Sequence, residues 1–201
     1  MAVIDWGDIL TVELHELENI FNKSELSYLA LTSKFEQTFR DRLAYELHKK
    51  NPDYIVSREW KRVDLAILDA KNFAPVVLIE LKAMYSFDMF TTKGPQQYLN
   101  NVQSDVEKMN NMTRDIQSSR PKLYTILIST HPHSKPDKKF DQVIKYAAQI
   151  RKYTPQLIDV LDEKVITVFK KSHPLKAKGT IIGGSAFNID VSLNYWLFGP
   201  Y

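Results

Sequence analysis

The stretch RVDLAILDAKNFAPVVLIELK, residues 62–82, predicts two strands joined by a short polar turn. Residues 63–68 are apolar and partly β-branched, and residues 69–72 (Asp-Ala-Lys-Asn) have the composition of a turn. Residues 76–79 form an unbroken apolar run, which is typical of a strand buried on both faces. The stretch therefore predicts a buried hairpin whose second strand ends in Glu-Leu-Lys, residues 80–82.

The charged residues of this hairpin are expected to meet at its open end. Side chains alternate between the faces of a strand, so Glu80 and Lys82 point to the same side. Asp64 lies about as far before a turn centred near Asn72 as Glu80 lies after it. Antiparallel pairing then places the two carboxylates opposite each other, with Cβ atoms roughly 5 Å apart. Such a pair is costly to bury, and a divalent cation removes that cost, because carboxylate and carbonyl oxygens suit Mg²⁺.

Asp64 followed after a hairpin by Glu80-x-Lys82 resembles the signature of the PD-(D/E)XK nuclease superfamily, which includes many restriction endonucleases. The resemblance covers the hairpin and, more loosely, residues 33–130. This chain departs from the family name at Val63, which stands where a proline is called for. The resemblance implies an α/β fold with a mixed central sheet flanked by helices, in the order αβββαβ.

The resemblance also implies a function, Mg²⁺-dependent hydrolysis of phosphodiester bonds in DNA, with Mn²⁺ as a possible substitute. Asp64, Glu80 and the Leu81 carbonyl would hold the metal. Lys82 would orient the attacking water or take its proton, and the product would carry a 5′-phosphate. Many relatives cut as homodimers, so a homodimer is expected.

A helix is predicted over residues 33–50, with an apolar stripe that repeats every four residues. Ser33 and Glu36 have the spacing of a capping box, which would fully account for Glu36. Many members of the superfamily carry an acidic residue on this first helix that assists the metal site. Glu36 is the first candidate for that role and Glu46 is the second.

The remaining elements are expected from periodicity. Residues 1–32 suggest a strand-like start that runs into a helix. The other expected elements are a strand at 54–60, a loop at 83–95, a helix at 96–118, a strand at 122–130, a polar loop at 131–139, a helix from 140 to before 155, and strands at 165–169 and 189–198.

Several side chains on these elements have two interpretations. Methionine and aromatic residues of the 83–95 loop either contact bases or belong to the core. Asp105 and Lys108 have the spacing of a pair on a helix surface. His131 and His133 have no third ligand nearby in the sequence and are expected in solvent. The aromatic residues of the last strand suggest packing or a dimer surface.

Lysines and arginines suggest two contacts with the DNA backbone. Lys61 and Arg62 precede the hairpin directly. Residues 170–179 form the most basic stretch of the chain, whose lysines contact phosphates or belong to a solvated loop (Lys170, Lys171, Lys176 and Lys178).

Composition sets the outer limits. The 201 residues suggest a single domain with a core at about 33–130 and C-terminal additions at 131–201. A hydrophobic fraction of 44% and a charged fraction of 25% are those of an ordinary globular protein, and a net charge of +3 is compatible with DNA. The chain has no cysteine, no signal-peptide pattern and no apolar run of membrane-spanning length, so a cytoplasmic protein without membrane contact is expected.

Two alternatives stay open. The chain can be a non-catalytic DNA- or protein-binding member of the same fold that acts as a subunit of a larger complex. The hairpin can also be a surface feature of an unrelated α/β domain, in which case Asp64 and Glu80 would point apart.

Overall fold

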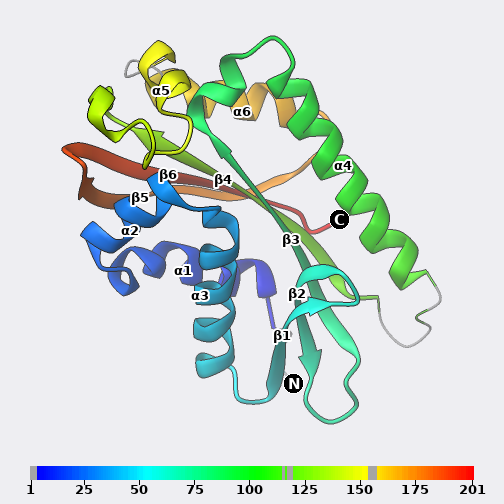
Figure 1. Ribbon diagram of the computed structural model, residues 1–201. Coiled ribbons are helices and arrows are strands. Elements are labelled where there is room, and N and C mark those ends of the chain that lie inside the picture. The colour runs from blue at the N-terminus through cyan, green and yellow to red at the C-terminus, as the bar shows by residue number, and fades with distance from the viewer. Residues whose placement is uncertain (1–3, 115, 117–119, 154–157) are drawn as a thin grey trace.

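The computed structural model describes residues 4–114, 116, 120–153 and 158–201. Its centre is a mixed sheet of six strands in the order β1-β2-β3-β4-β6-β5 (Figure 1). All neighbouring strands are antiparallel except β3 and β4, which are parallel. The strands are β1 (Tyr54–Trp60), β2 (Val63–Asp69), β3 (Pro75–Tyr85), β4 (Lys122–Pro132), β5 (Leu175–Ala186) and β6 (Ile189–Phe198).

Helices cover both faces of this sheet (Figure 1). One apolar core joins α1, α2, α3 and α5 to the sheet, and two smaller clusters join α4 and α6 to the opposite face. The expected α/β fold with a mixed sheet flanked by helices is therefore confirmed. The helices are α1 (Trp6–Ile20), α2 (Lys23–Thr32), α3 (Phe35–Lys50), α4 (Gly94–Thr113), α5 (Ala147–Tyr153) and α6 (Ile158–Phe169), with short 3-10 turns η1 (Ser86–Phe90) and η2 (Lys138–Phe140).

Alternation along the strands assigns each side chain to a layer. On β3, Ile79 and Leu81 belong to the core under α1–α3, whereas Leu78 and Met84 belong to the clusters under α4 and α6. Glu80, in step with Leu78, therefore points toward α4. The sheet is buried on both sides, which explains the apolar runs of β3 and β4.

The predicted hairpin is confirmed. Leu65 pairs with Ile79, so the same register continued by one residue sets Asp64 opposite Glu80. The turn is built by polar side chains: Asp69 accepts hydrogen bonds from the amides of residues 71 and 72, and Asn72 accepts one from residue 74. The strand expected at 54–60 and the strands around 122–130 and 189–198 are also present.

The strand-like start expected within residues 1–32 is wrong, because the described part forms two helices. The Asp5 carboxylate accepts hydrogen bonds from the amides of Gly7 and Asp8 and so caps α1. Buried Leu10, Leu14 and Leu17 then follow at helical spacing.

The strand expected at 165–169 is also wrong. These residues, although rich in β-branched side chains, form the last part of α6. In this helix Leu161, Val165 and Phe169 lie one turn apart and are all buried. The helix expected from residue 140 is shorter than predicted, since η2 and turns precede α5, and Pro155 lies outside the described residues. Likewise α4 ends at Thr113, and most of the predicted extension to 118 falls outside the described residues.

The loop expected at 83–95 begins later than predicted, because β3 continues to Tyr85 and leads directly into η1. Its large side chains belong mostly to the core: Met84, Tyr85, Phe87 and Met89 are buried. The aromatic side chains of β6 are buried as well, so they serve packing within the fold. Within the described ranges, no helix has both the length and the apolar character needed to cross a membrane.

Candidate active site

The site forms where β2 and β3 separate. The pairing between these strands stops at Leu65 and Ile79, so the following amides of β3 have no strand partner on that side. Two carboxylates take their place: Asp64 Oδ2 accepts a hydrogen bond of 2.8 Å from the Leu81 amide, and Glu36 Oε2 accepts one of 2.8 Å from the Ala83 amide. Buried backbone amides need hydrogen-bond acceptors, and here Asp64 and Glu36 provide them. Both acids therefore lie beside Glu80 and Lys82.

Glu80 is the most strongly perturbed acid of this group. Its side chain is only 3% exposed and pairs with the Lys108 ammonium of α4. Burial raises the pKa of Glu80 to about 8; the Lys108 ion pair opposes this shift, and the neighbouring Asp64 carboxyl adds to it. Glu80 Oε1 is the oxygen that contacts the Lys108 ammonium, and the Asp64 and Asp105 carboxyls both disfavour the ionised form of Glu80. A second positive charge would therefore stabilise the ionised Glu80.

Lys82 lies within a ring of oxygen atoms. Its Nζ is 2.7 Å from Asp105 Oδ2, 3.9 Å from Glu80 Oε2 and 3.1 Å from the Leu81 carbonyl oxygen. Burial alone would lower the pKa of Lys82, but the hydrogen bond and charge of Asp105, with the charges of Glu80 and Asp64, outweigh burial and raise it. Lys82 is therefore an ammonium at neutral pH.

The capping box expected at Ser33 and Glu36 is not formed. Ser33 Oγ donates a hydrogen bond to the Leu29 carbonyl, and Lys34 stands at the N-cap of α3 without a side-chain cap. Glu36 is free to reach across to Ala83 instead, and burial raises its pKa. Glu46, the second candidate, pairs with Lys49 on its own helix.

Asp105 and Lys108 belong to the site, although their spacing predicts a pair on the helix surface. Both side chains reach from α4 to β3, where Asp105 pairs with Lys82 and Lys108 pairs with Glu80. Asp105 does so because it lies among Val102, Val106 and Met109 in the buried stripe of the helix. An acid inside an apolar stripe was the available signal. Arg40 is a further residue of the site that the sequence pattern does not indicate: it lies one turn after Glu36, is 8% exposed, and its guanidinium is 4.0 Å from Asp64 Oδ1.

The basic residues expected to contact DNA divide into two groups. Lys61 and Arg62 lie exposed in the β1–β2 turn, and the Lys108 ammonium donates a hydrogen bond of 3.0 Å to the Arg62 carbonyl, so this turn adjoins the site. The lysines of residues 170–179 do not gather there, because β5 is the opposite edge strand of the sheet.

Two of those lysines are used within the fold. A bulge in β5 follows Leu175, and Lys176 pairs with Asp8 of α1 on one face of the sheet. Lys178 pairs with Asp162 of α6 on the other face. Lys170 and Lys171 are exposed between α6 and β5.

His131 corrects another expectation. It lies at the end of β4, is 1% exposed and has its Nδ1 2.8 Å from Ser86 Oγ, so it is not in solvent. His133 is exposed as expected.

Asp64, Glu80 and the Leu81 carbonyl are the oxygen donors of this site that could hold a metal ion with few protein ligands. Within the described residues, no group of three or more histidine, aspartate or glutamate side chains could hold a metal ion together. Two carboxylates and the Leu81 carbonyl remain, and Mg²⁺ is commonly held by one or two carboxylates while it keeps several waters. The observation that favours a cation here is the burial of Glu80 and its clustering with Asp64 and Asp105, which raise the pKa of Glu80 even though the Lys108 ammonium contacts its Oε1.

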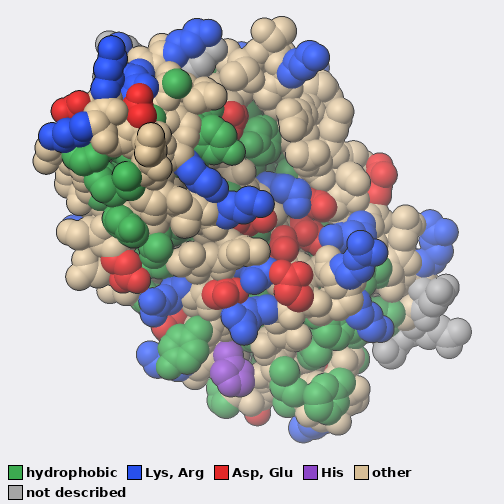
Figure 2. Space-filling view, in the orientation of Figure 1, with side chains coloured by type: hydrophobic (Ala, Val, Ile, Leu, Met, Phe, Trp, Pro, Cys, Tyr) green, Lys and Arg blue, Asp and Glu red, His purple; other side chains and the backbone are tan. Residues whose placement is uncertain are grey.

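The site lies on an accessible face. Acidic and basic side chains gather across the middle of the face seen in Figure 2, in the region where Figure 1 places β3 between α3 and α4. Comparison of the chain with models of protein families, with curated proteins and with solved structures gave no match.

Proposed function

We propose that the protein is a metal-dependent endonuclease that hydrolyses phosphodiester bonds in DNA. The observation that carries the proposal is the buried Glu80, whose pKa is raised to about 8 beside Asp64 at the open end of a hairpin. A strongly perturbed acid in an accessible charged cluster is a candidate functional group. The order α3-β1-β2-β3-α4-β4 supports the proposal, since it is the order that the resemblance to the PD-(D/E)XK nucleases implies.

Asp64, Glu80 and the Leu81 carbonyl would hold Mg²⁺ or Mn²⁺. When bound, such an ion supplies charge to the phosphate oxygens and lowers the pKa of a water. To contribute, Glu80 must lose its proton and the Leu81 carbonyl must be released by Lys82.

The protein's own residues have separate roles. Lys82, as an ammonium held by Asp105, orients the attacking water and stabilises negative charge that develops on the phosphate. Of the two roles expected for this lysine, a raised pKa favours orientation over proton abstraction. Glu36 fixes the β3 backbone beside Lys82 through the Ala83 amide. Lys61 and Arg62, exposed in the turn beside the site, would contact the DNA backbone.

One observation favours the second candidate, a DNA-binding or protein-binding subunit without catalysis. The Lys108 ammonium already contacts Glu80, and Lys82 already binds Asp105 and the Leu81 carbonyl, so the protein's own cations occupy the groups that a metal would use. In that function the charged cluster would be a structural or docking feature.

Cleavage of supercoiled plasmid DNA separates the two candidates. We expect nicking or linearisation with Mg²⁺ or Mn²⁺, none with EDTA, and none with Glu80→Gln or Lys82→Ala. Glu107→Gln is the matched control, because Glu107 is exposed on α4 and contacts Gln103. No cleavage by the wild type, together with no binding of Mg²⁺ or Mn²⁺ by calorimetry, would favour the binding subunit.

A further inference from the structure

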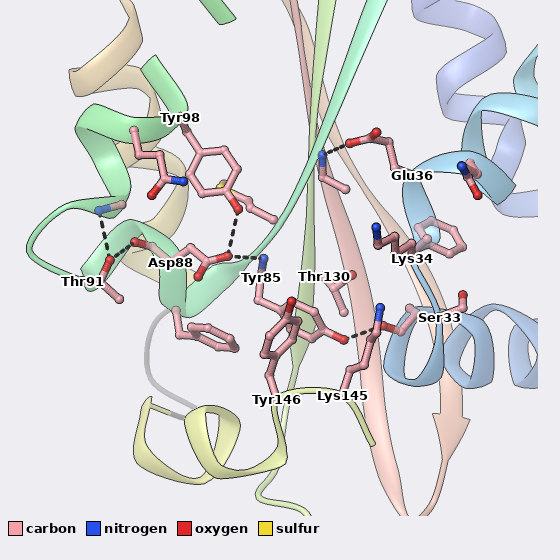
Figure 3. Close-up of a pocket in the computed structure, with 18 residues that line it drawn as sticks. Ser33, Lys34, Glu36, Tyr85, Asp88, Thr91, Tyr98, Thr130, Lys145 and Tyr146 are labelled. Carbon is pink, nitrogen blue, oxygen red and sulfur yellow. Dashed lines mark hydrogen bonds between the residues drawn. The ribbon is translucent and has the colours of Figure 1, made fainter. Parts of the chain in front are cut away.

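A pocket of about 520 Å³ opens beside the candidate active site, at the carboxyl ends of the parallel strands β3 and β4 (Figure 3). Its volume is in the range of small-molecule sites, about 300–1,000 Å³. The starts of α3 and α4, η1 and the segment before α5 surround it. Ligands of α/β proteins commonly bind at the carboxyl ends of strands.

Two lysines supply the positive charge of this pocket. Lys34 and Lys145 both line it, and Figure 3 shows both side chains extending into it from different sides. Within the described residues, neither ammonium has an ion pair or a hydrogen bond, in contrast to Lys82 and Lys108 nearby. Unpaired ammonium groups facing a cavity are suited to bind a phosphate group.

Aromatic rings form another wall of the pocket. Tyr85 and Phe87 stack with ring centroids 5.3 Å apart, and Tyr146 meets Tyr85 edge-on at 5.3 Å. Tyr146 is 53% exposed, so its ring is available to a ligand. Aromatic side chains beside cations are the usual elements that bind unpaired nucleotides, because every base has a flat face to stack.

The two acids of the pocket determine where a phosphate can lie. Asp88 Oδ2 accepts hydrogen bonds from the Tyr85 amide and the Tyr98 hydroxyl, and Glu36 accepts one from the Ala83 amide. Burial raises the pKa of both acids, and the hydrogen bonds that they accept act in the opposite direction. A phosphate would avoid both acids and lie by the lysines.

Glu36 and Ala83 belong to both the pocket and the candidate active site, and Lys82 is the next residue. We propose that the pocket binds an unpaired nucleotide of the DNA strand being cut, with its phosphate on Lys34 and Lys145 and its base against Tyr146. This inference rests on the proposed nuclease function and narrows its substrate. A base stacked in a duplex cannot enter such a pocket, so the substrate has single-stranded, looped-out or terminal nucleotides.

Binding of deoxythymidine 5′-monophosphate, measured by calorimetry or ligand-observed NMR, tests the pocket without cleavage. We expect Lys34→Ala/Lys145→Ala to weaken binding at least tenfold. The matched control is Lys71→Ala/Lys164→Ala, which removes the same charge from exposed positions on the β2–β3 turn and on α6. Tyr146→Ala should weaken nucleotide binding but leave inorganic phosphate binding unchanged. No binding by the wild type, or equal losses in both double variants, would overturn the inference.

Cleavage of three DNA forms then identifies the source of the nucleotide. Circular single-stranded DNA, a duplex with one looped-out thymidine and a fully paired closed duplex are compared. Faster cleavage of the first two, lost in the lysine double variant, supports the inference. Faster cleavage of the fully paired duplex would contradict the inference about the pocket. If Glu80→Gln abolishes cleavage of that duplex, the proposed nuclease function still holds. If no form of DNA is cleaved, the nuclease proposal fails, and the binding measurements above then determine whether the pocket is a nucleotide site.

Discussion

Asp105 Oδ2 on α4 lies 2.7 Å from Nζ of Lys82 on β3. This pair joins the helix that follows the hairpin to the residue at the centre of the proposed site. Both side chains are largely buried, at 14% and 26% exposure, so the interaction is less screened than a surface pair. Asp105 therefore controls both the position and the charge of Lys82.

Replacing Asp105 by asparagine should lower the pKa of Lys82, because burial then acts against its charge with less compensation. We expect the cleavage rate to fall at least tenfold at pH 8. As pH rises, the rate of the variant should also begin to decrease at a lower pH than that of the wild type, because Lys82 loses its proton earlier. A pH–rate profile measures this. Glu107→Gln should keep the wild-type profile, and identical profiles for all three proteins would exclude Asp105 as a positioning residue.

Glu80 predicts how stability depends on pH without metal. Its pKa rises from 4.5 in the unfolded chain to about 8 in the folded protein. Between these values the folded state holds a proton that the unfolded state has lost, so stability decreases as pH rises. In EDTA we expect the free energy of unfolding to fall between pH 5 and 9 by up to about 4 kcal/mol more in the wild type than in Glu80→Gln. Denaturant unfolding at several pH values checks this, and parallel pH dependences would contradict it.

The same acid predicts a pH-dependent response to Mg²⁺. Metal ligation requires the ionised carboxylate, so binding must displace the Glu80 proton below about pH 8. We expect Mg²⁺ to raise the melting temperature more at pH 8.5 than at pH 6. Ca²⁺ should act similarly, and Glu80→Gln should abolish the effect. An equal rise at both pH values would argue against ligation by Glu80.

Asp64 should separate catalysis from folding. Asparagine can still accept the hydrogen bond of the buried Leu81 amide, whereas alanine leaves that amide without an acceptor. Asp64→Asn should abolish cleavage with little change in stability, and Asp64→Ala should also cost about 1–3 kcal/mol. Urea unfolding of both variants measures the difference. If alanine is no less stable than asparagine, the Asp64–Leu81 bond is not a structural support.

The lysines of residues 170–179 should differ in their effects on DNA binding. Lys170 and Lys171 are exposed, whereas Lys176 and Lys178 pair with acids of α1 and α6. Removing the first two charges should reduce the slope of log affinity against log salt by up to about 2, if both contact phosphates. Removing the second two should change the slope less and lower the melting temperature more. Fluorescence anisotropy and thermal unfolding provide the two measurements.

The sequence predicted the parts of the fold that local rules determine. The β2–β3 hairpin follows from its apolar strands and from Asp69 and Asn72, whose side chains accept hydrogen bonds from the turn. The opposition of Asp64 and Glu80 follows from the register alone. In α6, by contrast, β-branched residues suggested a strand, and burial of Val165 and Phe169 at helical spacing overrode that propensity.

The site was harder to predict because its partners come from distant elements. Glu36 fits a local capping box, yet the unpaired Ala83 amide is its actual donor, 47 residues away. Asp105 and Lys108 fit a pair on the helix surface, but both turn toward β3. The partner of each side chain depends on how α3 and α4 pack against the end of β3, and this packing is not visible in the local sequence.

The carboxylates of Asp64 and Glu36 also have a consequence for the sheet itself. Beyond the end of its pairing with β2, β3 has amides at Leu81 and Ala83 that no neighbouring strand satisfies on that side. Each acid accepts a hydrogen bond from one of these amides. The groups proposed for chemistry thereby also complete the backbone hydrogen bonding of β3, so a variant that lacks both carboxylates would leave two amides of an interior strand without acceptors.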